Sequence, residues 1–285
     1  MRKKLSFITQ AVATLSFAFS MLFSALPAGA QTWVSLSAGD LIKLPDDGNV
    51  STTVDTAIYY FGADGLRYVF PNSKTYFTWY SGFTGVKSVS ATQLGTIGIG
   101  GNVTYRPGSR MIKIDSDPKV YAVGHGGARR WVTTQEVAIA LYGTDWNKKI
   151  DDVPDAFFSN YKDGEAINTS SQYNVSSVLA SNANITVDKE LVPPLEVSVN
   201  PDGTFTPSTF NITVGRTARF TNNTGVVARI ASDPHPDHTD LPGFDSAYIP
   251  VELNYVFKFK TTGSFGFHND SNPTSLQGTV TVVAQ

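Results

Sequence analysis

Two segments in the first half of this chain repeat one another at a constant offset of 62 residues. Residues 57–80 (AIYYFGADGLRYVFPNSKTYFTWY) align without gaps on residues 119–142 (KVYAVGHGGARRWVTTQEVAIALY), so that Tyr59 meets Tyr121. A repeat of this kind is one supersecondary unit, which needs a neighbour to bury its apolar face. The repeat therefore predicts two copies of one small unit that pack together, over about residues 34–107 and 108–165.

Each copy has the pattern of a short strand, a hairpin and a short helix. The apolar strand reads LIKL in the first copy and MIKI in the second, and Gly65 and Gly127 mark the hairpin turns. Tyr, Val, Phe and Trp flank both turns, which suits a pleated surface. Asn72 and Thr133 are the expected N-caps of the helices, because their side chains accept hydrogen bonds from the first helical turn.

The second half of the chain divides into a polar segment and a strand-rich domain. Residues 166–194 are dominated by Ser, Asn and Thr with little apolar periodicity, which predicts a flexible, exposed linker. Residues 195–285 contain about seven short apolar runs separated by turn residues, a pattern typical of an antiparallel β-sandwich. The expected fold is therefore mainly β, with tandem hairpin-and-helix repeats over residues 31–165, a linker and a C-terminal sandwich.

Residues 1–30 have the pattern of a secretory signal peptide. A basic start is followed by an apolar stretch and by an A-x-A cleavage site at 28–30, so we expect cleavage before Gln31. The alternative is a membrane anchor, but Pro27 and Gly29 interrupt the apolar run where a span would continue. We therefore expect an exported protein of the cell envelope or extracellular space that does not span a membrane after cleavage.

Composition limits the chemistry that the chain can perform. It has no cysteine, which excludes disulfides, thiolate metal sites and cysteine nucleophiles, and it has only four histidines. The formal net charge is −2, and a mildly acidic chain does not favour nucleic acid as a partner. No hydrolase motif and no phosphate-binding loop is found in the sequence.

Residues 195–285 resemble the cupredoxins. Phe205, Pro207, Gly215 and Phe220 stand at characteristic positions of the opening strands, and the chain closes with an apolar strand, a glycine turn and the segment FGFHNDSNP. The resemblance implies a Greek-key β-sandwich. It also places the ligands of a blue copper site, which are two imidazoles, a thiolate and an axial thioether. In this chain those ligand positions hold Ala228, Asn269, Asn272 and Ser275-Leu276 instead. We therefore expect neither a blue copper centre nor cupredoxin-like electron transfer.

The repeats resemble a unit found in bacterial cell-surface and cell-wall proteins. In the second copy the resemblance rests on Val120, Tyr121, Val123, Gly127 and Arg129. It implies a surface location and a partner in the cell wall or on the surface, either a glycan or a protein, which would bind through residues 34–165.

The C-terminal domain contains three of the four histidines and offers the best candidate for a chemical site. Two histidines stand in a proline-rich loop, and a third arrives with an aspartate from the closing strand. Three imidazoles and one carboxylate suit Cu(II) or Zn(II), and Asp233 or Asp237 could also supply the oxygen. The alternative is that these histidines are polar loop residues that cap turns. The candidate metal ligands are His235, His238, His268 and Asp270.

Side-chain alternation along a strand restricts where this site can lie. If Asn269 faces the pocket in which a cupredoxin holds copper, His268 faces the opposite side of the sheet. A site that includes His268 is then displaced from that pocket. Elsewhere, the acidic pairs Asp46-Asp47 and Asp151-Asp152 suggest calcium but lack EF-hand spacing, and we interpret them as solvated turns.

Three functions remain open on the sequence. The preferred one is an exported, non-catalytic envelope protein whose repeat module associates with the cell surface and displays the C-terminal domain. The second is a copper- or zinc-binding protein that uses the histidine cluster. The third is a metal-dependent redox or hydrolytic enzyme, which would need an open coordination position beside a pocket.

Overall fold

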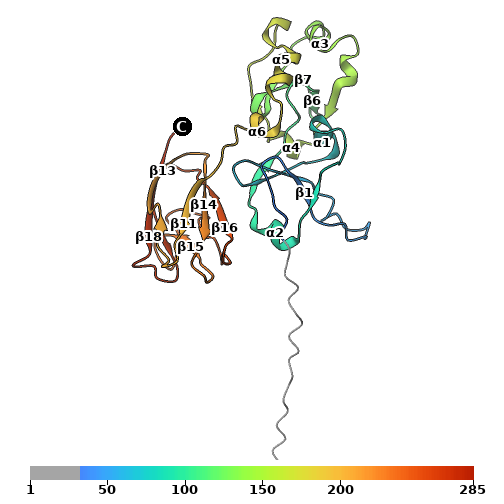
Figure 1. Ribbon diagram of the computed structural model, residues 1–285. Helices are drawn as coiled ribbons and strands as arrows, with labels where there is room; N and C mark the ends of the chain where they lie inside the picture. The colour runs from blue at the N-terminus through green and yellow to red at the C-terminus, as the bar shows by residue number, and fades with distance from the viewer. Residues whose placement is uncertain (1–32) are drawn as a thin grey trace, which may run out of the picture. The chain divides into compact units, whose positions relative to one another are not determined.

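The computed structural model describes residues 33–285 (Figure 1). The predicted signal peptide, residues 1–30, lies outside the described residues. Within 33–285, none of the helices combines the length and the apolar character that a membrane span requires. The described chain is mainly β, as predicted, and its strands form two five-stranded sheets followed by two four-stranded sheets.

The first sheet has the strand order β4-β1-β2-β3-β5. Its three central strands pair antiparallel, whereas β4 and β5 run parallel to their neighbours. Helix α1 connects β3 to β4, and helix α2 connects β4 to β5. The elements are β1 (Leu41–Lys43), β2 (Tyr59–Phe61), β3 (Arg67–Val69), α1 (Ser73–Trp79), β4 (Lys87–Ser88), α2 (Ala91–Thr96) and β5 (Ile99–Asn102).

The second sheet has the order β9-β6-β7-β8-β10, and each of its pairs has the same sense as its counterpart in the first sheet. Helical segments again connect the third strand to the fourth and the fourth to the fifth. The elements are β6 (Met111–Ile114), β7 (Asp117–Gly124), η1 (His125–Gly127), β8 (Ala128–Trp131), α3 (Gln135–Tyr142), η2 (Trp146–Lys149), β9 (Ile150–Asp152), α4 (Asp155–Phe158) and β10 (Lys162–Asp163).

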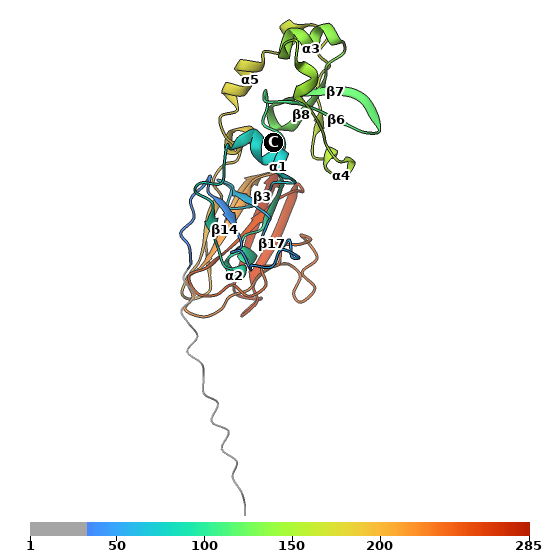
Figure 2. The ribbon, with the colours of Figure 1, turned by 90° about the vertical axis from the view of Figure 1, so that its right-hand side faces the viewer.

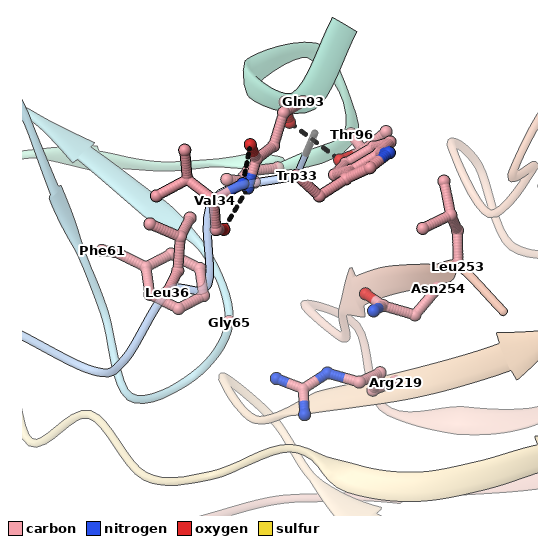
Figure 3. Close-up of a pocket in the computed structure, with 11 residues that line it drawn as sticks. Trp33, Val34, Leu36, Phe61, Gly65, Gln93, Thr96, Arg219, Leu253 and Asn254 are labelled. Atoms are coloured by element: carbon pink, nitrogen blue, oxygen red, sulfur yellow. Dashed lines mark hydrogen bonds between the residues drawn. The ribbon is translucent and has the colours of Figure 1, made fainter. Parts of the chain in front are cut away.

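The helix caps follow local hydrogen bonding. Asn72 caps α1 as predicted, with its side chain accepting a hydrogen bond of 2.8 Å from the Thr75 N–H. The cap of α3 is Thr134 rather than the predicted Thr133, because the N–H and hydroxyl of Thr133 both donate to the Ile167 carbonyl. Helix α2 is tied to a preceding segment by two hydrogen bonds between the Gln93 amide and the Val34 backbone, of 3.0 and 2.7 Å (Figure 3).

Residues 166–194 do not form the flexible, exposed linker that their composition predicted. They contain η3 (Ser170–Gln172), α5 (Val175–Ser181) and α6 (Ile185–Asp188). The polar residues that suggested a linker are the N-caps of these short helices. Ile185 is fully buried against the first sheet, and Tyr173 is buried against the second, where its hydroxyl donates to the Val123 carbonyl at 2.7 Å.

The C-terminal domain is a sandwich of two four-stranded sheets, with the orders β12-β11-β14-β16 and β13-β18-β17-β15. Strands β14 and β17, one from each sheet, are labelled in Figure 2. The predicted sandwich is therefore present, and β12 is a short strand that the sequence pattern did not indicate. The elements are β11 (Leu195–Val199), β12 (Phe205–Thr206), β13 (Thr209–Thr213), β14 (Thr217–Asn222), β15 (Ile230–Ser232), β16 (Asn254–Lys258), β17 (Gly263–Asn269) and β18 (Gln277–Val283).

We expected a purely antiparallel sandwich, but the observed sandwich contains both parallel and antiparallel strand pairs. Strands β11 and β14 pair parallel, and so do β13 and β18. In both pairs the chain crosses between the two sheets before it reaches the second strand, so no hairpin obliges the two strands to run antiparallel. Between the sheets lies an aromatic core in which Phe220, Phe244 and Phe267 are fully buried. Each such side chain contributes roughly 1.5–3 kcal/mol to folding.

Candidate metal centre

The four candidate ligands come from two segments that the sheet brings together. His235 and His238 lie in the loop after β15, and His268 lies in β17, with Asp270 directly after that strand. In the β15–β17 pair, Ala231 stands opposite His268, and the Asp270 N–H donates to the Arg229 carbonyl at 2.9 Å. This pairing places the start of the loop beside the end of β17.

The loop is held closely against the sheet. The Asp233 N–H donates to the Gly266 carbonyl at 3.0 Å, and the His238 N–H donates to the Pro234 carbonyl at 2.8 Å. At its far end the loop returns to the outer edge of β15, where the Ser232 N–H bonds the Phe244 carbonyl and the Ser246 N–H bonds the Ile230 carbonyl. The histidines are therefore fixed by backbone hydrogen bonds at both ends of the loop.

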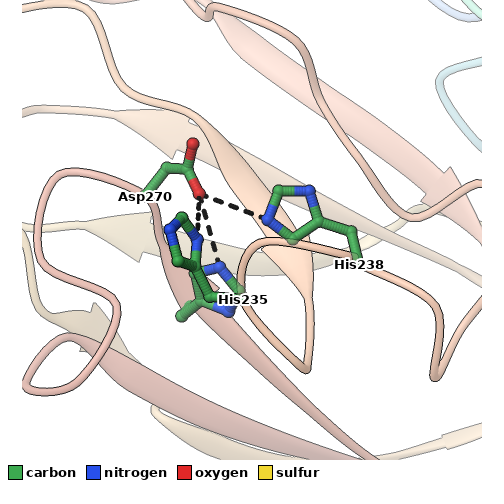
Figure 4. Close-up of side chains that lie close together, drawn as sticks. His235, His238 and Asp270 are labelled. Carbon is green, nitrogen blue, oxygen red and sulfur yellow. Dashed lines mark hydrogen bonds and ion pairs between the residues drawn. The ribbon is translucent and has the colours of Figure 1, made fainter.

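The three imidazoles converge on one carboxylate oxygen (Figure 4). Asp270 Oδ1 lies 3.0 Å from His235 Nδ1, 3.3 Å from His238 Nε2 and 3.4 Å from His268 Nε2. The ring centroids are 5.2 to 5.6 Å apart. The structure thus brings all four candidate ligands together, whereas Asp237 is exposed and stands outside this group.

Two of the converging nitrogens are buried and form no hydrogen bond within the described chain, although each lies within ion-pair distance of Asp270 Oδ1. The side chain of His268 is 0% exposed and that of His238 is 8% exposed, whereas His235 is 41% exposed. Within residues 33–285, Nε2 of His238 and Nε2 of His268 accept or donate no hydrogen bond. Solvent reaches the cluster from the side of His235.

Asp233 acts on His268 from the outer side of the cluster. Its Oδ1 lies 2.7 Å from His268 Nδ1, so that nitrogen carries the proton and Nε2 presents its lone pair to the cluster. The carboxylate fits there because Gly266 has no side chain: a Cβ at Gly266 would lie 1.9 Å from Asp233 Oδ2. Asp233 is therefore a partner of a ligand rather than a member of the group of four.

Arg229 neutralises the carboxylates around the cluster. Its guanidinium bonds Asp270 Oδ2 at 3.0 Å and also pairs with both oxygens of Asp245. Burial opposes ionisation of Asp270, but the charge of Arg229 and the interactions with His238 and His235 outweigh burial and lower its pKa. The hydrogen bond from Arg229 lowers the pKa of Asp245 to about 2. Both carboxylates are therefore ionised at neutral pH.

The positions that the cupredoxin resemblance assigns to copper ligands lie elsewhere in the domain. Asn269 is buried on the same face of β17 as Phe267, and its amide donates to the Gly203 carbonyl at 3.3 Å. Ala228 is buried and has no donor atom. His268 occupies the opposite face of β17, as strand alternation predicts. The histidine cluster is thus separate from the position of Asn269.

The remaining polar groups singled out in the sequence have other partners. The fourth histidine, His125, bonds Asn182 and Glu190 at 2.7 and 3.1 Å. The carboxylates of Asp151 and Asp152 form ion pairs of 2.6 Å with Arg110 and Lys113. A second acidic group consists of Asp46, Asp47 and Asp55. The Asp55 carboxylate accepts a hydrogen bond from the Asp47 N–H, which brings Asp55 to the predicted turn at Asp46-Asp47.

Comparison with known proteins gives limited likeness. No family model matches the chain, and no curated protein matches it significantly. Among solved structures it is similar to a Cu(I) form of an amicyanin mutant, with 16% identity over 32% of this chain and 82% of that one and a TM-score of 0.28. It is also similar to a purple cupredoxin from Nitrosopumilus maritimus (22% identity, 31% and 99%, TM-score 0.28).

A third similar structure is the oxidized plastocyanin from Dryopteris crassirhizoma, with 21% identity over 31% of this chain and 99% of that one and a TM-score of 0.26. Likenesses of this size do not assign a function. The description of the C-terminal domain as a cupredoxin-like β-sandwich rests on its own two sheets and their shared aromatic core.

Proposed function

We propose that the C-terminal domain is a metal-binding module that holds one divalent transition-metal ion. The ligands are His235 Nδ1, His238 Nε2, His268 Nε2 and one oxygen of Asp270. The main support is the pair of buried, unpartnered Nε2 atoms directed at one carboxylate oxygen. Buried polar atoms nearly always have a partner, because an unmet one costs about 1–3 kcal/mol. A bound cation gives both nitrogens a partner at once.

The donor set defines the class of metal. Three imidazole nitrogens and one carboxylate oxygen suit Zn(II), Cu(II) and Ni(II), whereas Ca²⁺ and Mg²⁺ prefer oxygen ligands alone. The chain has no cysteine and therefore cannot supply the thiolate of a blue copper site. The partial exposure of His235 provides a route by which the ion enters and leaves.

We further propose that the protein is exported and that residues 34–165 attach it to the cell surface. The supporting features are the A-x-A signal pattern of residues 1–30 and the resemblance of the repeats to units of bacterial surface proteins. On this proposal the metal-binding domain is displayed in the envelope rather than catalysing a reaction.

The metal proposal is tested by titrating the purified, metal-free chain with Zn(II) and Cu(II) in competition with a chelator of known affinity. We expect one ion per chain. His235→Ala is expected to weaken binding at least about tenfold, because it removes one of four ligands. His125→Ala is the matched control, since it removes a histidine that stands outside the cluster. Absence of binding, or equal affinity in the His235→Ala chain, would contradict the proposal.

The surface proposal needs a separate experiment. The full chain and a variant lacking residues 34–165 are expressed in a bacterial host, and their retention in the cell-wall fraction after sedimentation is compared. We expect retention only when the repeats are present. Equal retention of both chains would remove the assigned role of the repeats and leave the metal proposal untouched.

A further inference from the structure

We infer that the cluster is built for a four-coordinate, tetrahedral ion, and hence for Zn(II) rather than for a square-planar Cu(II) or Ni(II) ion. The inference rests on the proposed metal-binding function and adds the coordination geometry of that site. It is carried by the distances around Asp270 and by the contacts that hold its second oxygen.

The distances from Asp270 Oδ1 distinguish the two geometries. With bonds of about 2.0–2.1 Å, the edges of a tetrahedron are about 3.3–3.4 Å long. In a square plane with the same bonds, two nitrogens would lie about 2.8–3.0 Å from the oxygen, and the third would lie opposite it at about 4.0–4.2 Å. The observed distances are 3.0, 3.3 and 3.4 Å, so none of the nitrogens lies opposite the oxygen.

Arg229 limits Asp270 to one ligand oxygen. Its guanidinium bonds Asp270 Oδ2 at 3.0 Å while the same side chain is anchored on Asp245 at 3.0 Å. An oxygen engaged in this way is directed away from the cluster, and a bidentate carboxylate would have to break a charge-assisted hydrogen bond. Arg229 therefore limits the ligands that the protein supplies to four and acts as a residue that determines metal specificity.

The two buried imidazoles are held in position before an ion arrives. The hydrogen bond to Asp233 orients the ring of His268, and the ring of His238 has its Nδ1 3.4 Å from Asp245 Oδ2. Both side chains are more than nine-tenths buried, so neither ring can turn freely to meet a planar arrangement. Of the three histidines in the cluster only His235 is exposed, which leaves one adjustable ligand among the four.

The test uses cobalt as a spectroscopic substitute for zinc in the full chain. Four-coordinate Co(II) absorbs visible light intensely, whereas six-coordinate Co(II) absorbs weakly. We expect the intense spectrum, and we expect one equivalent of Zn(II) to abolish it by displacement. Weak absorption from bound Co(II) would overturn the tetrahedral assignment while leaving the metal proposal in place. Failure of Co(II), Zn(II) and Cu(II) alike to bind would overturn both.

A second measurement addresses Arg229 itself. Arg229→Gln frees the second oxygen of Asp270, so the Co(II) absorption is expected to weaken as the coordination number rises. The matched control is Arg219→Gln, which breaks an ion pair with Glu196 in the same domain but touches none of the ligands. An unchanged spectrum in folded Arg229→Gln protein would show that Arg229 does not determine the geometry. The spectrum of the wild-type chain decides the main inference even if this variant does not fold.

Discussion

Gly266→Ala tests whether the outer partner of His268 supports the proposed metal site. The glycine adopts an ordinary strand conformation, so an alanine meets no backbone strain there. Its new Cβ would lie 1.9 Å from Asp233 Oδ2, where ordinary contacts are 3.4–4 Å. The carboxylate must therefore move by roughly 1.5 Å, which exceeds what its 2.7 Å bond to His268 can tolerate.

The size of the effect follows from the burial of His268. Its side chain is fully buried, so loss of Asp233 leaves the Nδ1–H without a partner, at a cost of about 1–3 kcal/mol. Loss of such an outer partner of a metal ligand typically weakens metal binding about 10- to 100-fold. We expect Gly266→Ala to show both effects. Ser264→Ala should show neither, because Ser264 lies on the same face of β17 but is exposed.

The assay is a double-mutant cycle with Asp233→Ala, measured by urea unfolding of the metal-free chain and by zinc competition. If the alanine acts through Asp233, adding Gly266→Ala to Asp233→Ala should cost less than about 0.5 kcal/mol. If Gly266→Ala destabilises the wild-type chain and the Asp233→Ala chain by the same amount, the reasoning is refuted, because the alanine would then be acting on some other neighbour.

Three further predictions concern the rest of the molecule. Phe244→Ala should destabilise the sandwich by about 3–5 kcal/mol in urea unfolding, because it empties the centre of the aromatic core. Ile185→Ala should cost about 2–5 kcal/mol if residues 166–194 are packed, whereas a flexible linker would show no change. The hydrogen bond to Asn182 raises the pKa of His125, and a weaker contribution comes from Glu190, while burial opposes both. His125 therefore stabilises the fold fully below pH 6.5, and this contribution is lost as the pH rises through its folded pKa. Because the side chain is exposed, the stability difference between wild type and His125→Ala should be larger at about pH 5 than at about pH 9 by at most about 1 kcal/mol. A difference that grows with pH would contradict the assignment.

The sequence predicted the mainly β fold and the C-terminal sandwich, because apolar runs separated by turn residues are a local signal. It failed for residues 166–194, since Asn and Thr at helix caps look the same in composition as Asn and Thr in a linker. It also missed the parallel pairs β11–β14 and β13–β18, because a crossing between sheets leaves no mark on the periodicity of single strands.

The sequence also predicted the ligands of the candidate site but not the residues around them. The types and spacing of the histidines indicated which side chains could bind a metal, and the structure brings His235, His238, His268 and Asp270 together. No sequence pattern indicated Arg229, because its link to Asp270 depends on the register of β15 on β17. Whether an ion binds there stays a prediction.

The loop that carries His235 and His238 has a second consequence for the protein. Strand β15 is the last strand of its sheet, and an uncovered last strand offers free N–H and C=O groups to any extended chain in solution. Phe244 and Ser246, at the loop's return, occupy those groups. A shortened loop would therefore lose the two histidines and also leave the edge of β15 open to self-association, so the loop that carries the proposed metal ligands also covers the sheet edge.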